Sequence, residues 1–361
     1  MLEEVAPRNL AAFDLVSVIL PTVSRIGKIW TWLKWPAALG ILAWLYWRNH
    51  ETLAQVAAVP KAWGFLLAAV GLIAGSTLLT FLRWYLLVRA LKFSFRIRDA
   101  LRLGFLGLLS NYVAPGSTGG DIVKAILLAR DHPERKTIAV ATVLLDRILG
   151  LLALFLVGAV ASLTPIVVPD DPKLKLCTLL LWVGAVGGLA GVGLMLLPAI
   201  THSRWVNALT RLPMVGHMVS ELLHGAKLYQ TQPVVLLKAL ALSVAGHAGL
   251  ISGFYCCALW MQQPWIPDLV THFYFMPNAE LFGVIIPAPG GVGPLEAAIQ
   301  WFYSLLRPEN VESTQAEAAG LMAALAFRVV TVGIAAIGGA YYFTARRELA
   351  AAMHEAEANP A

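Results

Sequence analysis

The chain has 361 residues, of which 58% are hydrophobic and only 13% are charged, whereas a typical soluble domain carries about 25% charged residues. This composition excludes an ordinary water-soluble enzyme or binding domain, because so few charged side chains cannot cover a folded surface of this size. The net charge of +6 does not indicate nucleic-acid binding, since Lys and Arg lie mainly in short segments between apolar stretches, where membrane topology accounts for them.

The chain begins with a segment, residues 1–34, that we expect to be cytoplasmic or interfacial. Its apolar run at residues 15–23 is short and no small-residue cleavage pattern follows it, so a cleaved signal peptide is not expected. Residues 10–33 are a candidate interfacial helix that would place Trp30 and Trp32 at the level of the lipid headgroups.

Six apolar stretches are predicted to span a membrane, because most of them reach the roughly 20 residues that a hydrocarbon core requires. They are residues 35–47, 62–82, 137–163, 176–197, 234–260 and 316–343. The first is short and needs residues 30–33 as an extension. We therefore expect residues 35–345 to form one transmembrane domain and residues 346–361 to form a cytoplasmic tail.

Two further apolar regions, residues 101–130 and 269–306, are interrupted by Pro and Gly. The interruptions share the pattern APGxxG, which contains Pro115 in the first region and Pro289 in the second. Proline removes a backbone donor and glycine permits positive φ, so both residues end a helix and let the chain reverse. An acidic residue follows each interruption and begins an apolar half-helix: Asp121 in the first region and Glu296 in the second.

Basic residues predict the topology, because cytoplasmic loops are enriched in Lys and Arg. The segments predicted to be cytoplasmic contain Arg8, Arg25, Lys28 and Lys34, then Arg83, Arg89, Lys92, Arg96, Arg98 and Arg102, then Arg130, Arg135 and Lys136, then Arg204, Arg211 and Lys227, and finally Arg346 and Arg347. With these loops inside, the first interrupted region leaves and returns on the cytoplasmic side and the second on the external side. Each motif alone also fits a surface loop, but the shared pattern, the acid, a downstream arginine and the opposed topology together favour two re-entrant hairpins.

The predicted fold is thus all-α: a polytopic membrane bundle of about six spanning helices plus two re-entrant hairpins in an inverted repeat. Paired interrupted segments at corresponding positions of inverted halves mark the substrate site of many transporters, near the middle of the bilayer. Irregular backbone at that depth is tolerated only inside the protein or beside a water-filled cavity.

Charged side chains within the spans are further candidates, because each costs about 2.5–3.5 kcal/mol at mid-bilayer and therefore needs a partner. Arg147 and Arg328, one in each half, are expected to contact a lipid phosphate or a hairpin carboxylate, since guanidinium pairs with both. A static salt bridge between helices is an equally weighted alternative. Asp146 points about 100° away from Arg147 on a helix, so we expect its partner on another helix.

Other polar residues have less specific interpretations. Asp121 and Glu296 fit helix caps as well as substrate contacts. Lys124 fits a position near the cytoplasmic side or a side chain that extends to the headgroups. His247 is interpreted as an interior histidine with satisfied hydrogen bonds, in preference to a proton relay. No recognisable metal or nucleophile spacing is formed by His247, His272, Asn278 and Glu280, and the three cysteines show no metal or CxxC spacing. We expect no catalytic residue, metal or cofactor.

Four segments in this order resemble a known family: residues 111–125 (NYVAPGSTGGDIVKA), 144–150 (LLDRILG), 286–297 (IPAPGGVGPLEA) and 326–328 (AFR). The chain is similar to the transmembrane, flippase-like domain of lysylphosphatidylglycerol synthases, which also occurs as stand-alone membrane proteins. The resemblance implies lipid translocation, with two hairpins that meet near a lipid cavity. The family usually has Glu where Asp146 stands. We do not expect the aminoacyl-transferase domain of the fused synthases here.

From these observations we expect a non-enzymatic, multi-pass protein of a bacterial-type plasma (inner) membrane, with both termini cytoplasmic, that flips a polar lipid or phospholipid. A lipid-binding structural or assembly subunit is the alternative, and an intramembrane enzyme ranks third, because Ser117, Thr118 and Asp121 fit no hydrolase pattern. The expected partner is a membrane lipid and not a nucleic acid, and a homo-oligomer stays open.

The candidate substrate-binding residues share a position in or beside the interruptions or in the span that follows each of them. They are Asn111, Pro115, Gly120, Asp121, Lys124, Asp146, Arg147, Pro289, Gly290, Gly291, Glu296 and Arg328.

Overall fold

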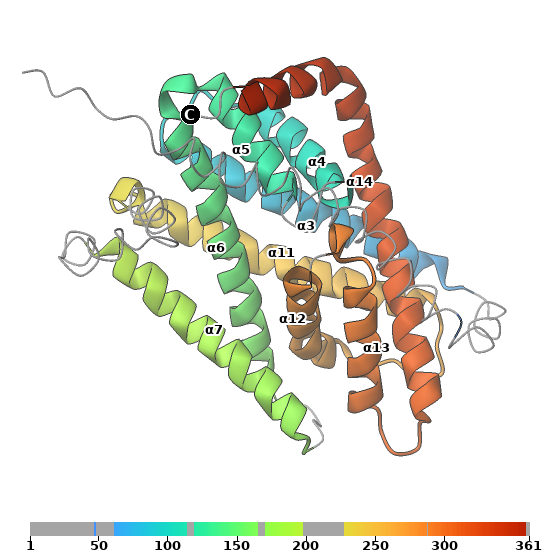
Figure 1. Ribbon diagram of the computed structural model, residues 1–361. Coiled ribbons are helices and arrows are strands. Elements are labelled where there is room, and N and C mark those ends of the chain that lie inside the picture. The colour runs from blue at the N-terminus through green and yellow to red at the C-terminus, as the bar shows by residue number, and fades with distance from the viewer. Residues whose placement is uncertain are drawn as a thin grey trace, which may run out of the picture.

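The computed structural model describes residues 47, 61–113, 119–164, 170–197, 227–286 and 288–358, with only the backbone described from residue 343 onward. Within these ranges every regular element is a helix (Figure 1). The predicted N-terminal interfacial helix, the first predicted span apart from Trp47, and the first Pro/Gly interruption at residues 114–118 lie outside the described residues.

Five described helices contain a stretch long and apolar enough to cross a membrane. They are α3 (Trp63–Ala90), α6 (Lys136–Ala161), α7 (Pro172–Leu196), α11 (Pro233–Trp260) and α14 (Ser313–Ala358). These helices correspond to five of the six predicted spans, and their ends follow local signals. For example, Pro172 begins α7 and the Asp171 side chain accepts a hydrogen bond from the Lys173 amide, 2.7 Å away. The chain is a multi-pass membrane protein.

The predicted end of the second span was wrong. We placed the end at residue 82 and assigned Arg83 to a cytoplasmic basic segment, but α3 continues to Ala90 and the Arg83 residue is only 6% exposed. A charged residue marks the end of an apolar stretch in the sequence, but the helix itself can continue beyond that residue. Here Asp146 on α6 supplies a counter-charge to Arg83, so the helix continues with Arg83 inside the bundle.

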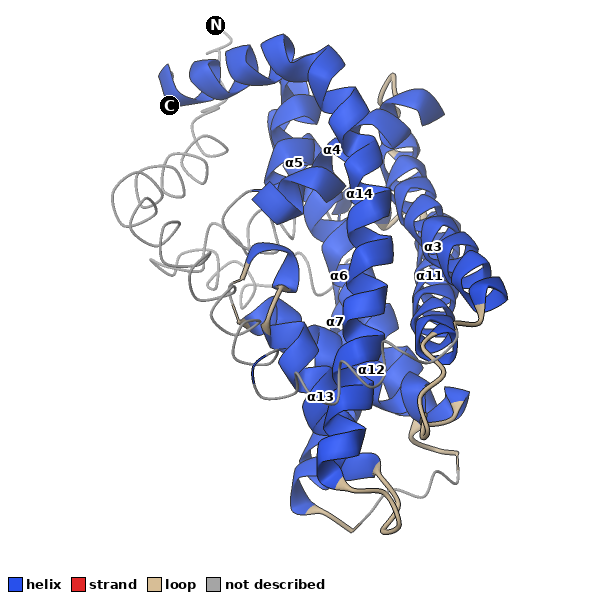
Figure 2. Ribbon diagram, turned by 90° about the vertical axis from the view of Figure 1, so that its right-hand side faces the viewer, coloured by secondary structure: helices blue, strands red, loops and turns tan. Residues whose placement is uncertain are grey.

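Both interrupted regions form two short helices joined by a break. The first pair is α4 (Ile97–Val113) and α5 (Gly119–Asp131), and the second is α12 (Leu269–Ile285) and α13 (Pro294–Leu306), with the short 3₁₀ helix η2 (Pro289–Gly291) at its break. A further 3₁₀ turn, η1 (Pro133–Arg135), joins α5 to α6. The two helical pairs lie at opposite ends of the bundle in both views (Figures 1 and 2).

The chain direction is reversed between the two halves. Figure 1 shows that α6, which follows the first pair, runs in the opposite direction to α14, which follows the second. The helices that precede the pairs, α3 and α11, are packed together and antiparallel. Their close approach uses small residues: a Cβ atom at Gly249 would lie 2.5 Å from Ser76 Oγ, and one at Gly253 would lie 2.6 Å from Ile73 Cγ1.

The buried apolar side chains form two large clusters with polar residues between them. One cluster includes Trp84 and Leu149 and lies around α4 and α5, whereas the other includes Phe254 and Phe302 and lies around α12 and α13. Helix α11 passes through both clusters. Along this helix, the polar residues Ser243 and His247 lie between Ala239 of the apolar core around α4 and α5 and Ile251 of the apolar core around α12 and α13. The bundle therefore carries a polar layer between two apolar cores.

The outer face of the bundle is apolar, as contact with hydrocarbon requires. Helix α7 buries only four residues and leaves most of its large apolar side chains exposed, including Leu176, Leu179, Leu180, Val183 and Val186. A soluble protein does not expose a patch of this kind, so the surface supports membrane insertion of the described helices.

Two adjacent glycines of α14 provide a test of the packing between α14 and α4. A Cβ atom at Gly338 would lie 2.3 Å from the Phe105 carbonyl oxygen, whereas one at Gly339 would meet nothing within 4 Å. We expect Gly338→Ala to destabilise the protein by about 1–3 kcal/mol, because backbone atoms cannot easily move aside. Gly339→Ala is the matched control and should be neutral or stabilise by up to about 1 kcal/mol. The measurement is chemical denaturation in detergent micelles, and equal effects of the two substitutions would contradict the packing.

Candidate functional site

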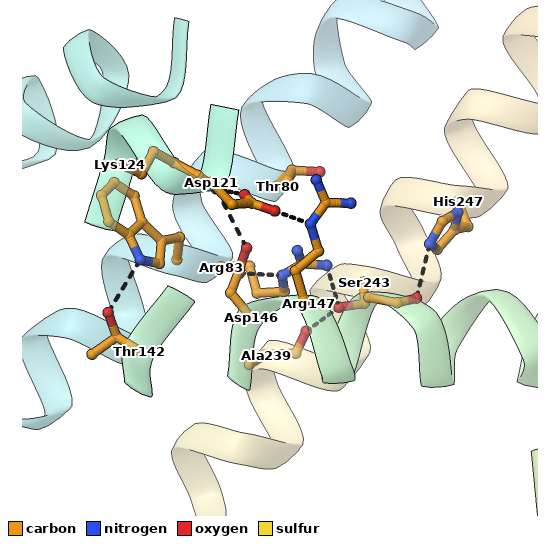
Figure 3. Close-up of polar contacts among 12 residues, drawn as sticks. Thr80, Arg83, Asp121, Lys124, Thr142, Asp146, Arg147, Ala239, Ser243 and His247 are labelled. Atoms are coloured by element: carbon orange, nitrogen blue, oxygen red, sulfur yellow. Dashed lines mark hydrogen bonds and ion pairs between the residues drawn. The ribbon is translucent and has the colours of Figure 1, made fainter. Parts of the chain in front are cut away.

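A cluster of five charged side chains lies where α3, α5 and α6 meet (Figure 3). Arg83 on α3 donates a hydrogen bond from Nε to Asp146 Oδ1 at 2.6 Å, and from Nη1 to Ser243 Oγ at 2.8 Å. The prediction that Asp146 has its partner on another helix is therefore confirmed. The sequence analysis missed Arg83 as a member of this cluster and Ser243 as its hydrogen-bond partner.

The other members connect α5 to α6. Arg147 on α6 donates from Nε to Asp121 Oδ2 on α5, and Lys124 Nζ lies 2.8 Å from Asp121 Oδ1 and 3.8 Å from Asp146 Oδ2. Lys124 also lies over the Trp84 ring, 5.1 Å from its centroid. The interpretation of Lys124 as a side chain that extends to the headgroups was wrong, because both carboxylates draw its ammonium group into the cluster.

This cluster, called the first cluster below, carries a net positive charge. It holds three cationic side chains, from Arg83, Lys124 and Arg147, and two carboxylates, from Asp121 and Asp146, which gives a net charge of +1. The Arg147 side chain is 36% exposed, whereas the other four are 14% exposed or less. The excess positive charge is thus accessible at Arg147.

A second cluster joins α13 to α14. Arg328 on α14 donates from Nε to Glu296 Oε1 at 2.7 Å, and from Nη1 to the Gly290 carbonyl at 2.7 Å. Glu296 Oε2 accepts the Gly293 amide hydrogen bond at 2.6 Å. Glu296 therefore acts as a helix cap, as one of its two predicted roles requires, and also as the ion-pair partner of Arg328. At 1% exposed, it is much better buried than Asp121.

The second break has the backbone geometry that its glycines predict. The backbone φ values of Gly290, Gly291 and Gly293 are 58°, 68° and 94°, which residues with a Cβ atom rarely adopt. α12 has already ended at Ile285, and the conformation of the glycines leaves the Gly290 carbonyl directed at Arg328. Pro289 begins η2 beside these glycines. The Pro/Gly motif thus supplies the carbonyl that the arginine binds.

The last turn of α4, in the first helical pair, meets the break of the second pair. A Cβ atom at Gly290 would lie 2.5 Å from Tyr112 Cδ1, so the Tyr112 ring at the end of α4 packs directly on the second break. The Tyr112 hydroxyl also lies beside the Arg328 guanidinium. Sequence analysis did not single out Tyr112. The available signal was its position in the last turn before the first APGxxG motif.

Two of the predicted site residues hold the first pair of helices together. Asn111 Oδ1 accepts a hydrogen bond from the Gly120 amide at 2.8 Å, and a Cβ atom at Gly120 would lie 2.0 Å from the Gly107 carbonyl oxygen. Asn111 and Gly120 therefore set how closely α4 and α5 approach. Pro115 lies outside the described residues.

The two halves differ at one corresponding position. The residue before Arg147 is Asp146, which forms an ion pair with Arg83 of α3. The residue before Arg328 is Phe327, whose ring packs on Phe254 of α11 with a centroid distance of 5.4 Å. An ion pair in one half thus takes the place of an aromatic pair in the other. In the described helices and loops, no three His, Cys, Asp or Glu side chains come together as a metal site.

Comparison with known families agrees with this architecture. Residues 32–339 match the family described as the lysylphosphatidylglycerol synthase TM region. The chain belongs to this family. The match includes both charged clusters and both breaks, and it confirms the resemblance inferred from the four sequence segments. Searches of curated proteins and of solved structures gave no match.

The Arg83–Asp146 pair of this family member allows a test of charge burial. Arg83→Met should destabilise the protein by about 3–5 kcal/mol, because it leaves the Asp146 carboxylate buried with only the more distant Lys124 beside it. The double variant Arg83→Met/Asp146→Leu should recover most of that loss, since no unpaired charge remains. Chemical denaturation in micelles, followed by circular dichroism, measures both. A double variant less stable than Arg83→Met would contradict this account.

Proposed function

We propose that this protein moves a polar lipid, most simply an anionic phospholipid, between the two leaflets of a membrane. The observation that carries the proposal is the meeting of two interrupted helical pairs inside the bundle, where Tyr112 of the first pair contacts Gly290 and Arg328 of the second half. This junction brings the Arg328 guanidinium and the backbone carbonyl that it binds into the interior of the bundle, where apolar helices alone would exclude a polar headgroup.

Helix lengths support re-entrant hairpins. α5 and α13 have 13 residues each, about 20 Å at 1.5 Å per residue, whereas a hydrocarbon core is about 30 Å thick. α4 and α12 have 17 residues each, about 26 Å. Each pair therefore turns back before crossing the membrane. The pairs lie at opposite ends of the bundle (Figure 1), and we propose that one is inserted from each leaflet.

The first cluster can exchange partners without leaving a buried charge unpaired. Asp121 has two cationic partners, Arg147 and Lys124. When a lipid phosphate binds Arg147, Asp121 keeps Lys124, so the carboxylate remains neutralised. A phosphate also matches the net charge of +1 of the cluster and the bidentate geometry of guanidinium. We assign Arg147 as the residue that first binds the headgroup.

The second cluster has a different role in this proposal. Arg328 is bound to Glu296 and to Gly290 on two sides of the same break. It therefore holds the second hairpin in its reversed conformation and lines the path at the junction with Tyr112. The lipid tails remain in hydrocarbon, so the protein acts as a transporter of the headgroup and not as an enzyme. A bacterial-type inner membrane with both termini in the cytoplasm agrees with the distribution of basic residues.

Reconstitution into liposomes tests the proposal. We expect wild-type protein to move a fluorescent anionic phospholipid between leaflets, measured by quenching of the outer leaflet. Arg147→Ala should slow this movement by about 10- to 100-fold, the effect of losing one charge-assisted hydrogen bond of about 1.5–3 kcal/mol, and Arg147→Lys should retain part of it. Lys175→Ala, which removes an exposed cation paired with Asp170, is the matched control and should keep the wild-type rate.

Two outcomes would contradict the proposal. Identical rates in wild type, Arg147→Ala and Arg328→Ala would exclude the assigned role of the arginines. Phospholipid that co-purifies with a protein showing no translocation would instead favour a lipid-binding structural or assembly subunit.

A further inference from the structure

A second titratable pair, His247 on α11 and Glu280 on α12, lies apart from the two charged clusters. His247 Nδ1 is 3.7 Å from Glu280 Oε2. His247 belongs to the polar layer between the two apolar cores, one helical turn beyond Ser243. Its interpretation as a fully hydrogen-bonded interior histidine holds only at Nε2, because Nδ1 has no hydrogen-bond partner among the described residues.

The hydrogen bond at Nε2 decides the tautomer. His247 Nε2 lies 3.1 Å from the Gly150 carbonyl oxygen (Figure 3), and a carbonyl only accepts hydrogen bonds, so Nε2 carries a hydrogen. In the neutral ring Nδ1 then has a lone pair, which would face the oxygen of a Glu280 carboxylate. Two acceptors repel each other at this distance. A proton between them, on the glutamic acid or on Nδ1, removes the repulsion.

Charge burial leads to the same result. Glu280 Oε1 is buried and has no hydrogen-bond partner within the described part of the chain. An uncompensated carboxylate in such a place costs several kcal/mol, which protonation removes. The charged side chains of the two clusters already have partners. They are Arg83 with Asp146, Arg147 with Asp121, and Glu296 with Arg328.

The pair is accessible and is connected to the first cluster. The side chains of His247 and Glu280 are 19% and 18% exposed, so neighbouring helices do not cover the pair completely. Gly150, whose carbonyl binds His247, lies against the guanidinium of Arg83, since a Cβ atom at Gly150 would be 3.2 Å from Arg83 Nη1. Glu280 itself is part of α12, the first helix of the second hairpin.

We propose that His247 and Glu280 form a proton-binding site and that its proton is exchanged during lipid movement. With the proton bound the pair is neutral overall, and after release to water it consists of a neutral imidazole and a carboxylate, with a charge of −1. That charge attracts Arg83 across Gly150, in competition with Asp146, and so loosens the first cluster. The coupling rests on the proposed lipid translocation, whereas the proton site does not.

Infrared difference spectra of the purified protein at high and low pH test the site alone. We expect carboxyl and imidazole bands in the wild type that disappear in Glu280→Gln, which keeps the shape of the side chain but cannot exchange a proton. Glu317→Gln, a carboxylate on α14 away from both clusters, is the matched control and should retain the bands. If Glu280→Gln does not fold, His247→Gln replaces it, with loss of the imidazole band expected. Spectra unchanged by the substitution would overturn the proton site.

Liposomes with an imposed pH gradient test the coupling. In the wild type, the gradient should change the rate of phospholipid movement by about 5- to 150-fold, the usual range for two coupled binding events, and an internal pH dye should report proton movement. Glu280→Gln should move lipid at a rate independent of the gradient. If the wild-type rate of lipid movement is the same with and without the pH gradient, the coupling is overturned and the proposed function still stands. Absence of any lipid movement in the wild type would overturn the proposed function and the coupling, and the infrared result alone would then decide the proton site.

Discussion

A guanidinium among apolar helices is stable only beside a counter-charge, and in both halves of this protein the counter-charge comes from the half-helix after a Pro/Gly break. Asp121 meets Arg147 and Glu296 meets Arg328 in this way. Each ion pair joins a half-helix to the long helix that follows it. The second break can therefore persist inside the bundle, because Arg328 of the same half binds the Gly290 carbonyl that the break releases.

The two halves use this device with different strength. Glu296 is sealed and bound on both oxygens, by Arg328 and by the Gly293 amide, so the second hairpin is held firmly. Asp121 shares two cations, and one of them, Arg147, remains accessible. The halves also differ in the contact made by the residue before the arginine. In the first half Asp146 forms an ion pair with Arg83, whereas in the second half Phe327 packs on Phe254. We infer a division of labour in which the first cluster exchanges partners and the second maintains the fold.

The polar layer connects these elements. Arg83 of α3 contacts both Ser243 of α11 and Gly150 of α6. The Gly150 carbonyl binds His247 of α11, and Glu280 extends the series to α12. The layer lies between two apolar cores, so a change of charge within it acts on its nearest polar neighbours first. This arrangement gives the proposed proton site a physical route to the first cluster, because one displaced guanidinium is enough to alter the pairing of Asp146.

The sequence alone determined the membrane class, the positions of five described spans and the two breaks, since these depend on local properties: apolar length, Pro, Gly and nearby charge. It also identified Arg147, Arg328, Asp121, Glu296 and Asp146, because a charge within an apolar stretch is conspicuous. Only the tertiary structure showed that Arg83 is inside the bundle, that Tyr112 packs on Gly290, and that His247 faces Glu280. The partners in each of these contacts lie far apart along the chain, and packing between helices, which no local pattern encodes, brings them together.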